Sequence, residues 1–257
     1  QDNITYYKYP RIPHLVADLG ILDNPVEVYE KMDGGNSQIR KINSRVVCGS
    51  RSKFLGPKGT LNRQWFIDFQ KWALSNPSFY HLPEDVVVYG EWLSLHSLEY
   101  KPEFINRFFL LDILDVNTER FLPYKKAQES LAGYNVEGVN YLPTLLAGNV
   151  TLGELEALVK KSNYRNGKME GVVVKDYNSN PQRFAKLWTS IVSDQKNEFT
   201  YDYVRKVALS LIDDGMKLTE NFLVQEVIKE LEASHFSSSI SKGELKKLAH
   251  QYIEDNK

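Results

Sequence analysis

The 257-residue sequence has one cysteine and no long apolar run. The single Cys48 excludes an internal disulfide and a cysteine-rich metal site, a scarcity that is typical of proteins from a reducing compartment. No apolar stretch approaches the ~18 residues that span a bilayer, and residues 1–10 lack the apolar centre of a signal peptide. We therefore expect a protein without membrane association that works in the cytoplasm of its own cell or, if it is viral, of the host.

A large excess of charge of one sign is also absent, since the formal net charge is -1. This excludes a protein coated with positive charge, but the balance hides a local asymmetry. Between Gly34 and Ile67 there is no acidic residue, whereas seven basic ones occur: Arg40, Lys41, Arg45, Arg51, Lys53, Lys58 and Arg63. Such a segment favours the phosphates of a nucleotide or a nucleic acid, with an ordinary exposed basic loop as the alternative.

Mixed strands and helices are predicted for the first three quarters of the chain. Alternating apolar and polar residues and short apolar runs predict strands over 26–29, 38–42, 46–48, 86–92, 108–114, 171–177 and 184–188. Helical spacing predicts helices over 61–75, 125–131 and 152–162, with Thr151 and Glu154 as a capping box for the last. We therefore expect a domain of mixed α and β structure over residues 1–195.

Only helical periods follow after about residue 196. Apolar residues recur every three to four positions in three groups, which predicts three short helices. Gly215 is expected to end the first helix, and Ser241 with Glu244 forms a capping box for the third. Residues 196–257 are therefore predicted to form a small all-α domain.

The segment from Glu30 to Asn36 (EKMDGGN) carries the clearest chemical signal. In it a lysine, Lys31, ends an apolar strand immediately before a Gly-Gly turn, so its amine is expected to be accessible. A lysine becomes a nucleophile when burial or a neighbouring cation lowers its pKa. The motif alone is weak, because an ordinary hairpin lysine produces the same pattern.

Further charged residues lie within or beside apolar strands in a fixed order. Such residues cost free energy unless they are paired or bound to an ion, so several of them together indicate a site. They are Arg51 after Ser50, Glu91, Asp112, Glu170 before the strand that ends in Lys175, and Lys186.

The order and spacing of these segments resemble the covalent nucleotidyltransferase superfamily, which comprises ATP-dependent polynucleotide ligases and mRNA capping enzymes. The resemblance covers most of the first ~190 residues. Lys31 to Gly34 resembles motif I, Ser50-Arg51 motif Ia, Glu91 motif III, Asp112 motif IIIa, Glu170-Gly171 motif IV and Lys186 motif V. Asn36, the opening residues 9–15 and the helical tail are similar to the RNA ligase branch, which includes phage-type and RNA-editing-type ligases. The implied fold is α+β: ATP-grasp-like antiparallel sheets with flanking helices, followed by a small all-α domain.

The resemblance implies a role for each residue of these motifs. Lys31 would attack the α-phosphate of ATP and hold AMP, Lys175 and Lys186 would supply nearby positive charge, and Asp33 would orient the lysine or a metal-bound water. Glu170 would hold Mg²⁺ (or Mn²⁺), partly through water. Glu91 and Arg51 would contact the ribose and the 5′-phosphate end, Glu30 would lie near the adenine amino group, and Asn36 would act in the later steps.

Two motifs depart from the pattern of the superfamily. The position before Asp112, which often carries an aromatic that stacks on the base, is Leu111, with Phe109 two residues back on what should be the same strand face. In motif V only the second of the usual two lysines is present, so Lys175 or Arg183 is expected to contribute more to the phosphate contacts.

The implied function is an ATP-dependent RNA ligase, a monomer that joins 5′-phosphate and 3′-hydroxyl RNA ends. A DNA nick ligase or a capping guanylyltransferase is the nearest alternative, and a non-catalytic nucleotide- or RNA-binding module is the second. Because the residues of the motifs all precede residue 195, we expect a fragment ending near Ser193 to form the lysine adduct by itself. The basic residues of the tail would then bind RNA phosphates: Lys217, Lys229, Lys242, Lys246 and Lys247.

Overall fold

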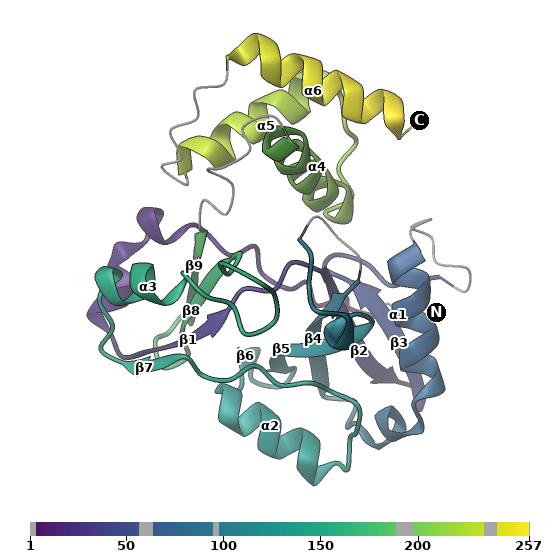
Figure 1. Cartoon of the computed structure of the whole chain (residues 1–257). Coiled ribbons are helices and arrows are strands. Elements are labelled where there is room, and N and C mark those ends of the chain that lie inside the picture. Colours follow the sequence, from purple (N-terminus) through teal and green to yellow (C-terminus); the bar gives the residue numbers. More distant parts are fainter. Residues whose placement is uncertain (1–3, 57–63, 95–97, 189–197, 234–240, 257) are drawn as a thin grey trace.

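The computed structural model, which describes residues 4–56, 64–94, 98–188, 198–233 and 241–256, contains two antiparallel sheets and a group of three helices (Figure 1). One sheet has the strand order β7 (Leu146–Gly148), β1 (Val26–Glu30), β8 (Gly171–Asp176) and β9 (Arg183–Trp188). The other has the order β3 (Arg45–Ser50), β2 (Gly35–Ile42), β4 (Val86–Leu93), β5 (Arg107–Asp115) and β6 (Arg120–Phe121). The α+β class with antiparallel sheets is thereby confirmed.

Three helices flank the sheets: α1 (Gln64–Ser75), α2 (Tyr124–Gly133) and α3 (Leu152–Leu158). Phe66 and Phe69 of α1 are fully buried in the core of the five-stranded sheet. Residues 61–63, which the sequence predicted to begin this helix, lie outside the described residues. The predicted capping box of α3 is present, but the helix ends four residues earlier than expected, before the chain turns toward Ser162. Short 3₁₀ helices are η1 (Leu15–Ala17), η2 (Leu19–Asp23), η3 (Pro77–His81) and η4 (Pro102–Phe104).

The connection from β1 to β2 crosses from one sheet to the other. The backbone N–H of Lys31 donates to the carbonyl of Gly171, 2.9 Å away, and thus ties the segment to β8. At Gly34 a Cβ would lie 2.4 Å from the carbonyl oxygen of Trp92, so only glycine fits this close approach. The crossing therefore fixes Lys31 at the junction of the two sheets.

The last three helices are α4 (Glu198–Asp213), α5 (Glu220–Ala233) and α6 (Lys242–Asp255), which we call the helical tail. They enclose an apolar cluster of their own, and the partly buried Trp188 of β9 packs against this cluster. Gly215, with a φ of +77°, follows α4, and the Ser241–Glu244 capping box opens α6, as the sequence predicted. The predicted boundary at residue 195 lies outside the described residues and stays a prediction. No helix in the described parts of the chain is long and apolar enough to cross a membrane.

Candidate active site

A pocket lies where the two sheets and the helical tail meet. Nine of the residues singled out in the sequence line it: Glu30, Lys31, Asp33, Asn36, Arg51, Glu91, Leu111, Lys175 and Lys186. The tail lines it as well, with Lys206, Val207, Leu209, Ser210 and Glu230. The sequence had suggested a site complete by residue 195, but helices α4 and α5 form part of its wall.

The side chain of Lys31 is 21% exposed and contacts the carboxylate of Glu170. Its Nζ lies 3.1 and 3.2 Å from the two oxygens of this group. Burial lowers the pKa of Lys31, while Glu91 and Asp33 oppose the shift and Arg51 reinforces it. The lysine therefore meets the condition for a nucleophile more readily than an exposed lysine does.

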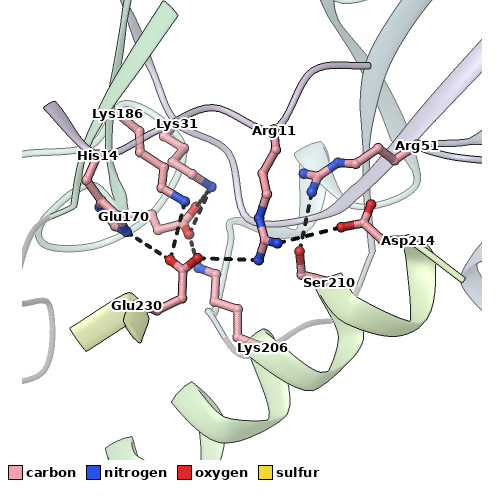
Figure 2. Close-up of polar contacts among 10 residues, drawn as sticks. All are labelled: Arg11, His14, Lys31, Arg51, Glu170, Lys186, Lys206, Ser210, Asp214 and Glu230. Carbon is pink, nitrogen blue, oxygen red and sulfur yellow. Dashed lines mark hydrogen bonds and ion pairs between the residues drawn. The ribbon is translucent and has the colours of Figure 1, made fainter. Parts of the chain in front are cut away.

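Lys206 of α4 reaches the same carboxylate (Figure 2). Its Nζ contacts Glu170. The same Nζ lies 3.2 Å from the Oδ1 of Asp33, so one ammonium bridges two acidic side chains. Burial lowers the pKa of Lys206 to about 8. Sequence reasoning missed this lysine, because it lies outside the motifs and the helical period does not say which surface its face contacts.

A second ionic group surrounds Glu230 of α5 (Figure 2). Its carboxylate lies 2.9 Å from His14 Nε2, 3.3 Å from Arg11 Nη2 and 3.8 Å from Lys186 Nζ. Burial alone would raise the pKa of Glu230, but the hydrogen bond from His14 and the charges of Lys186 and Arg11 hold it at about 2. Burial likewise lowers the pKa of Lys186 to about 8, against the attraction of Glu230.

Trp188 lies between the cations of the site. Its ring centroid is 4.6 Å from Lys186 Nζ, 5.0 Å from Lys206 Nζ and 5.9 Å from Lys31 Nζ. These distances suit cation–π contacts, which stabilise positive charge without neutralising it. The sequence held a signal for this residue, because Trp188 stands two positions after Lys186 on one strand and therefore on the same face.

Lys175 has a different environment from the one expected. Its Nζ lies 2.8 Å from the Oδ2 of Asp112 and 2.7 Å from the carbonyl oxygen of Leu111. Both side chains of the ion pair are almost fully buried, and Tyr9 and Tyr177 donate further hydrogen bonds to Asp112. Since its charge is matched by Asp112, Lys175 is better suited to hold the pocket wall together than to lower the pKa of Lys31.

Phe109 does not face the pocket, contrary to the sequence-based expectation. It is 2% exposed and its ring packs edge-on against Phe104 and Tyr164, whereas Leu111 lines the pocket. The pairing of β4 with β5 contains a bulge that leaves Leu111 without a partner, so residues 109 and 111 no longer share a face. Arg183, the other considered phosphate contact, is ion-paired with Asp18 and does not line the pocket.

The remaining predicted residues surround Lys31. Glu91 accepts a hydrogen bond from the backbone N–H of Gly34 at 3.0 Å, and Arg51 donates to the hydroxyl of Ser210 at 3.3 Å. Asn36 is buried, and among the described residues its Oδ1 finds no hydrogen-bond partner. The carboxylate of Glu30 accepts from the Ser162 hydroxyl and from the backbone of residue 163.

The sequence profile of the RNA ligase family matches residues 24–188 of this chain, which is more than half of its length. An uncharacterized protein of Methanocaldococcus jannaschii is 26% identical over 209 residues, which cover 80% of this chain and 48% of that protein. The chain therefore spans about half the length of this relative.

Solved structures of ligases are similar as well. The structural match to an archaeal ATP-dependent RNA ligase covers 96% of this chain and 62% of the ligase chain, with a TM-score of 0.58 and 21% sequence identity. A provisionally named ATP-dependent DNA ligase of Aquifex aeolicus matches 97% and 63%, with a TM-score of 0.55 and 19% identity. A Naegleria gruberi RNA ligase variant with AMP and Mn matches 73% and 57%, with a TM-score of 0.52 and 20% identity. At these identities the likeness establishes the shared fold.

Proposed function

This chain belongs to the RNA ligase family, and from that premise we propose that it joins 5′-phosphate and 3′-hydroxyl RNA ends in an ATP-dependent reaction. The reaction would pass through a lysyl-AMP and then an adenylylated RNA. The observation that carries the proposal is the position of Lys31: a partly buried amine at the junction of two sheets, in contact with Glu170 and facing a pocket rich in cations.

The first step of the proposed reaction forms a bond between Lys31 Nζ and the α-phosphorus of ATP. The bond from that phosphorus to the bridging oxygen breaks, pyrophosphate leaves with the electron pair, and the amine gives up a proton. Burial favours this step, because it lowers the pKa of Lys31 and so raises the fraction of neutral amine. Lys186 and Arg51, which line the same pocket, would stabilise the charge that develops on the phosphate.

The rest of the nucleotide is assigned from the lining of the pocket. Tyr29, Leu111, Leu142 and Val173 give it an apolar part that suits a purine ring. The carboxylate of Glu30 is already engaged, so its backbone is the group that would meet the adenine amino group. We propose that Glu91 contacts the ribose hydroxyls and that Asn36 acts in the steps that follow adenylylation of the lysine.

A divalent cation is implied by the family resemblance, and the residues present suit one. Mg²⁺ and Mn²⁺ prefer oxygen ligands, and Mg²⁺ is usually held by one or two carboxylates together with water and phosphate. Glu170 and Asp33 are two such carboxylates, close enough to share the ammonium of Lys206. The cation would neutralise phosphate charge, and the Naegleria gruberi ligase with AMP and Mn supports this assignment.

Two alternatives keep the same lysine chemistry. A DNA nick ligase is favoured by the similarity to the Aquifex aeolicus protein, and a capping guanylyltransferase would use GTP in place of ATP. The described part of the chain from residue 198 onward forms three helices. Both alternatives would predict a β-rich barrel after the catalytic domain, so this arrangement counts against them. A non-catalytic binding module is the third alternative, and the intact set of charged residues counts against it.

The deciding experiment is covalent labelling of the denatured protein after incubation with Mg²⁺ and α-labelled ATP or GTP. We expect label from ATP alone, and none on Lys31→Ala, because the nucleophile is gone while the fold is retained. Lys126→Ala, which removes a 72% exposed lysine from α2, is the matched control and should label normally. Label on Lys31→Ala would remove this residue from its role, and efficient labelling by GTP would favour the capping class.

The metal assignment has a separate test. In Glu170→Gln we expect weaker labelling and a shift of the Mg²⁺ titration to higher concentrations, because one charged oxygen ligand is lost. Glu154→Gln, at the exposed start of α3, is the control. An unchanged Mg²⁺ titration in Glu170→Gln would contradict its assignment as a ligand.

A further inference from the structure

The helix α4 presents a polar face to the pocket. Lys206 and Ser210 of α4 and Asp214, the residue directly after the helix, are spaced by four residues, so they lie along one side of the helical path. Lys206 contacts Glu170, Ser210 accepts from Arg51, and Asp214 lies 4.0 Å from Arg11 (Figure 2). Lys206 also contacts Asp33. The opposite side of α4 packs into the apolar cluster of the tail through Val204, Ala208 and Leu211. The polar face is therefore not needed for the packing of the tail itself.

Lys206 is the residue of this face that contacts the two acidic side chains beside Lys31. Its side chain is 25% exposed, it bridges Glu170 and Asp33, and it stands 5.0 Å from the ring of Trp188. Both acidic partners are the carboxylates that the proposed function assigns to a divalent cation. The ammonium thus shares its two charged partners with that cation.

Shared partners have an electrostatic consequence. When Glu170 and Asp33 bind a divalent cation, their electrostatic attraction for the ammonium of Lys206 becomes weaker. A partly buried ammonium that loses its carboxylates is destabilised unless another anion takes their place. In a nucleotide pocket that already has Lys31, Lys186 and Arg51 for the α-phosphate, the remaining anion is the outer part of the polyphosphate.

We propose that Lys206 binds the β- and γ-phosphates of ATP, so that the helical tail completes the site of the first reaction step. This inference rests on the proposed function and deepens it. It makes Lys206 a residue that recognises the triphosphate and the departing pyrophosphate. AMP, which lacks these phosphates, does not engage it.

The test compares the binding of Mg²⁺·ATP with that of AMP by calorimetry in the non-reacting Lys31→Ala chain. Adding Lys206→Met should weaken ATP binding at least tenfold, a difference of about 1.4 kcal/mol, and change AMP binding less than twofold. The matched control is Lys126→Met, which removes a 72% exposed lysine from α2 and should change neither affinity. Equal losses for ATP and AMP, or an unchanged ATP affinity, would overturn the proposal.

Manganese alone supplies a readout of opposite sign. In Lys206→Met the two carboxylates lose their competing ammonium, so Mn²⁺ should bind more tightly, as measured by electron paramagnetic resonance of the free ion. Unchanged or weaker Mn²⁺ binding would contradict the shared site. If the methionine variant lacks the near-UV circular dichroism of the parent, Lys206→Gln replaces it with the same expected results. A wild-type chain that takes no label from ATP refutes the proposed function, whereas normal labelling with an unchanged ATP-to-AMP ratio refutes this inference alone.

Discussion

The ion pair of Lys175 and Asp112 is buried in the wall of the pocket, where Lys175 is one of the lining residues. The two side chains are 3% and 0% exposed, and the rings of Tyr29 and Phe184 stand 5.3 and 5.2 Å from the ammonium. Burial lowers the pKa of Lys175, and the charge of Asp112 opposes that shift. The pair therefore stabilises the strands that form the pocket, because each charge depends on the other for its solvation.

Removing one partner of this pair should be costly. In Asp112→Asn we expect the free energy of unfolding to fall by about 3–5 kcal/mol, because an uncompensated charge stays buried. Urea unfolding followed by circular dichroism measures this loss. Glu129→Gln breaks the exposed pair with Lys126 on α2 and, as a control, should cost at most about 1 kcal/mol. Equal, small losses in the two variants would show that the pair contributes no more than a surface contact.

At the scale of elements, α5 is held to the sheets by Glu230. This carboxylate contacts His14 and Arg11 from the N-terminal segment and Lys186 from β9. Its pKa is depressed from 4.5 to about 2 in the folded chain. A carboxylate whose pKa is depressed by folding stabilises the folded chain at pH values above its pKa in the unfolded chain. This contribution is lost as the pH falls through its pKa in the folded chain.

The contribution of Glu230 should therefore depend on pH. We expect Glu230→Gln to lower the free energy of unfolding near neutral pH, and the difference from the wild type to disappear as the pH falls from 4.5 to about 2. Chemical unfolding at a series of pH values gives this difference directly. Glu232→Gln, at an exposed position of the same helix, is the control and should change little. If the difference between Glu230→Gln and the wild type persists at the lowest pH of the series, Glu230 stabilises the fold through packing and not through its charge.

At the scale of the whole molecule, the helical tail lies over the junction of the two sheets (Figure 1). The tail has its own apolar cluster, so it is built as a separate unit, yet Lys206 and Glu230 line the pocket. The five basic residues assigned to RNA on sequence grounds are exposed and do not line this pocket. Contact with RNA phosphates stays a prediction for that outer surface.

Removal of the tail should therefore affect the first reaction step. A fragment ending at Ser193 lacks Lys206, so we expect it to bind AMP like the full chain but to form the lysine adduct at least tenfold more slowly. Rates of labelling and AMP affinities measure the two properties, and circular dichroism checks that the fragment folds. Labelling at the rate of the full chain would restore the original expectation that residues 1–195 form a complete site.

The sequence by itself singled out the residues of the motifs. Nucleophilic attack, metal binding and phosphate contacts require particular residue types, so Lys31, Glu170 and Lys186 could be proposed as site residues from their order along the chain and its resemblance to the superfamily. Local rules also determined the capping boxes of α3 and α6, because a cap depends on residues only three positions apart.

Only the tertiary structure decided which residues share a face or meet across elements. The bulge opposite Tyr89 and Gly90 separates Phe109 from Leu111, and no pattern within β5 alone indicates it. A helical period shows that α4 has an apolar side, but not that Lys206 on another side contacts Glu170, which lies 36 residues earlier in the chain. Such contacts depend on how whole units dock, because an ion pair between distant residues forms only after the surfaces that carry them have met.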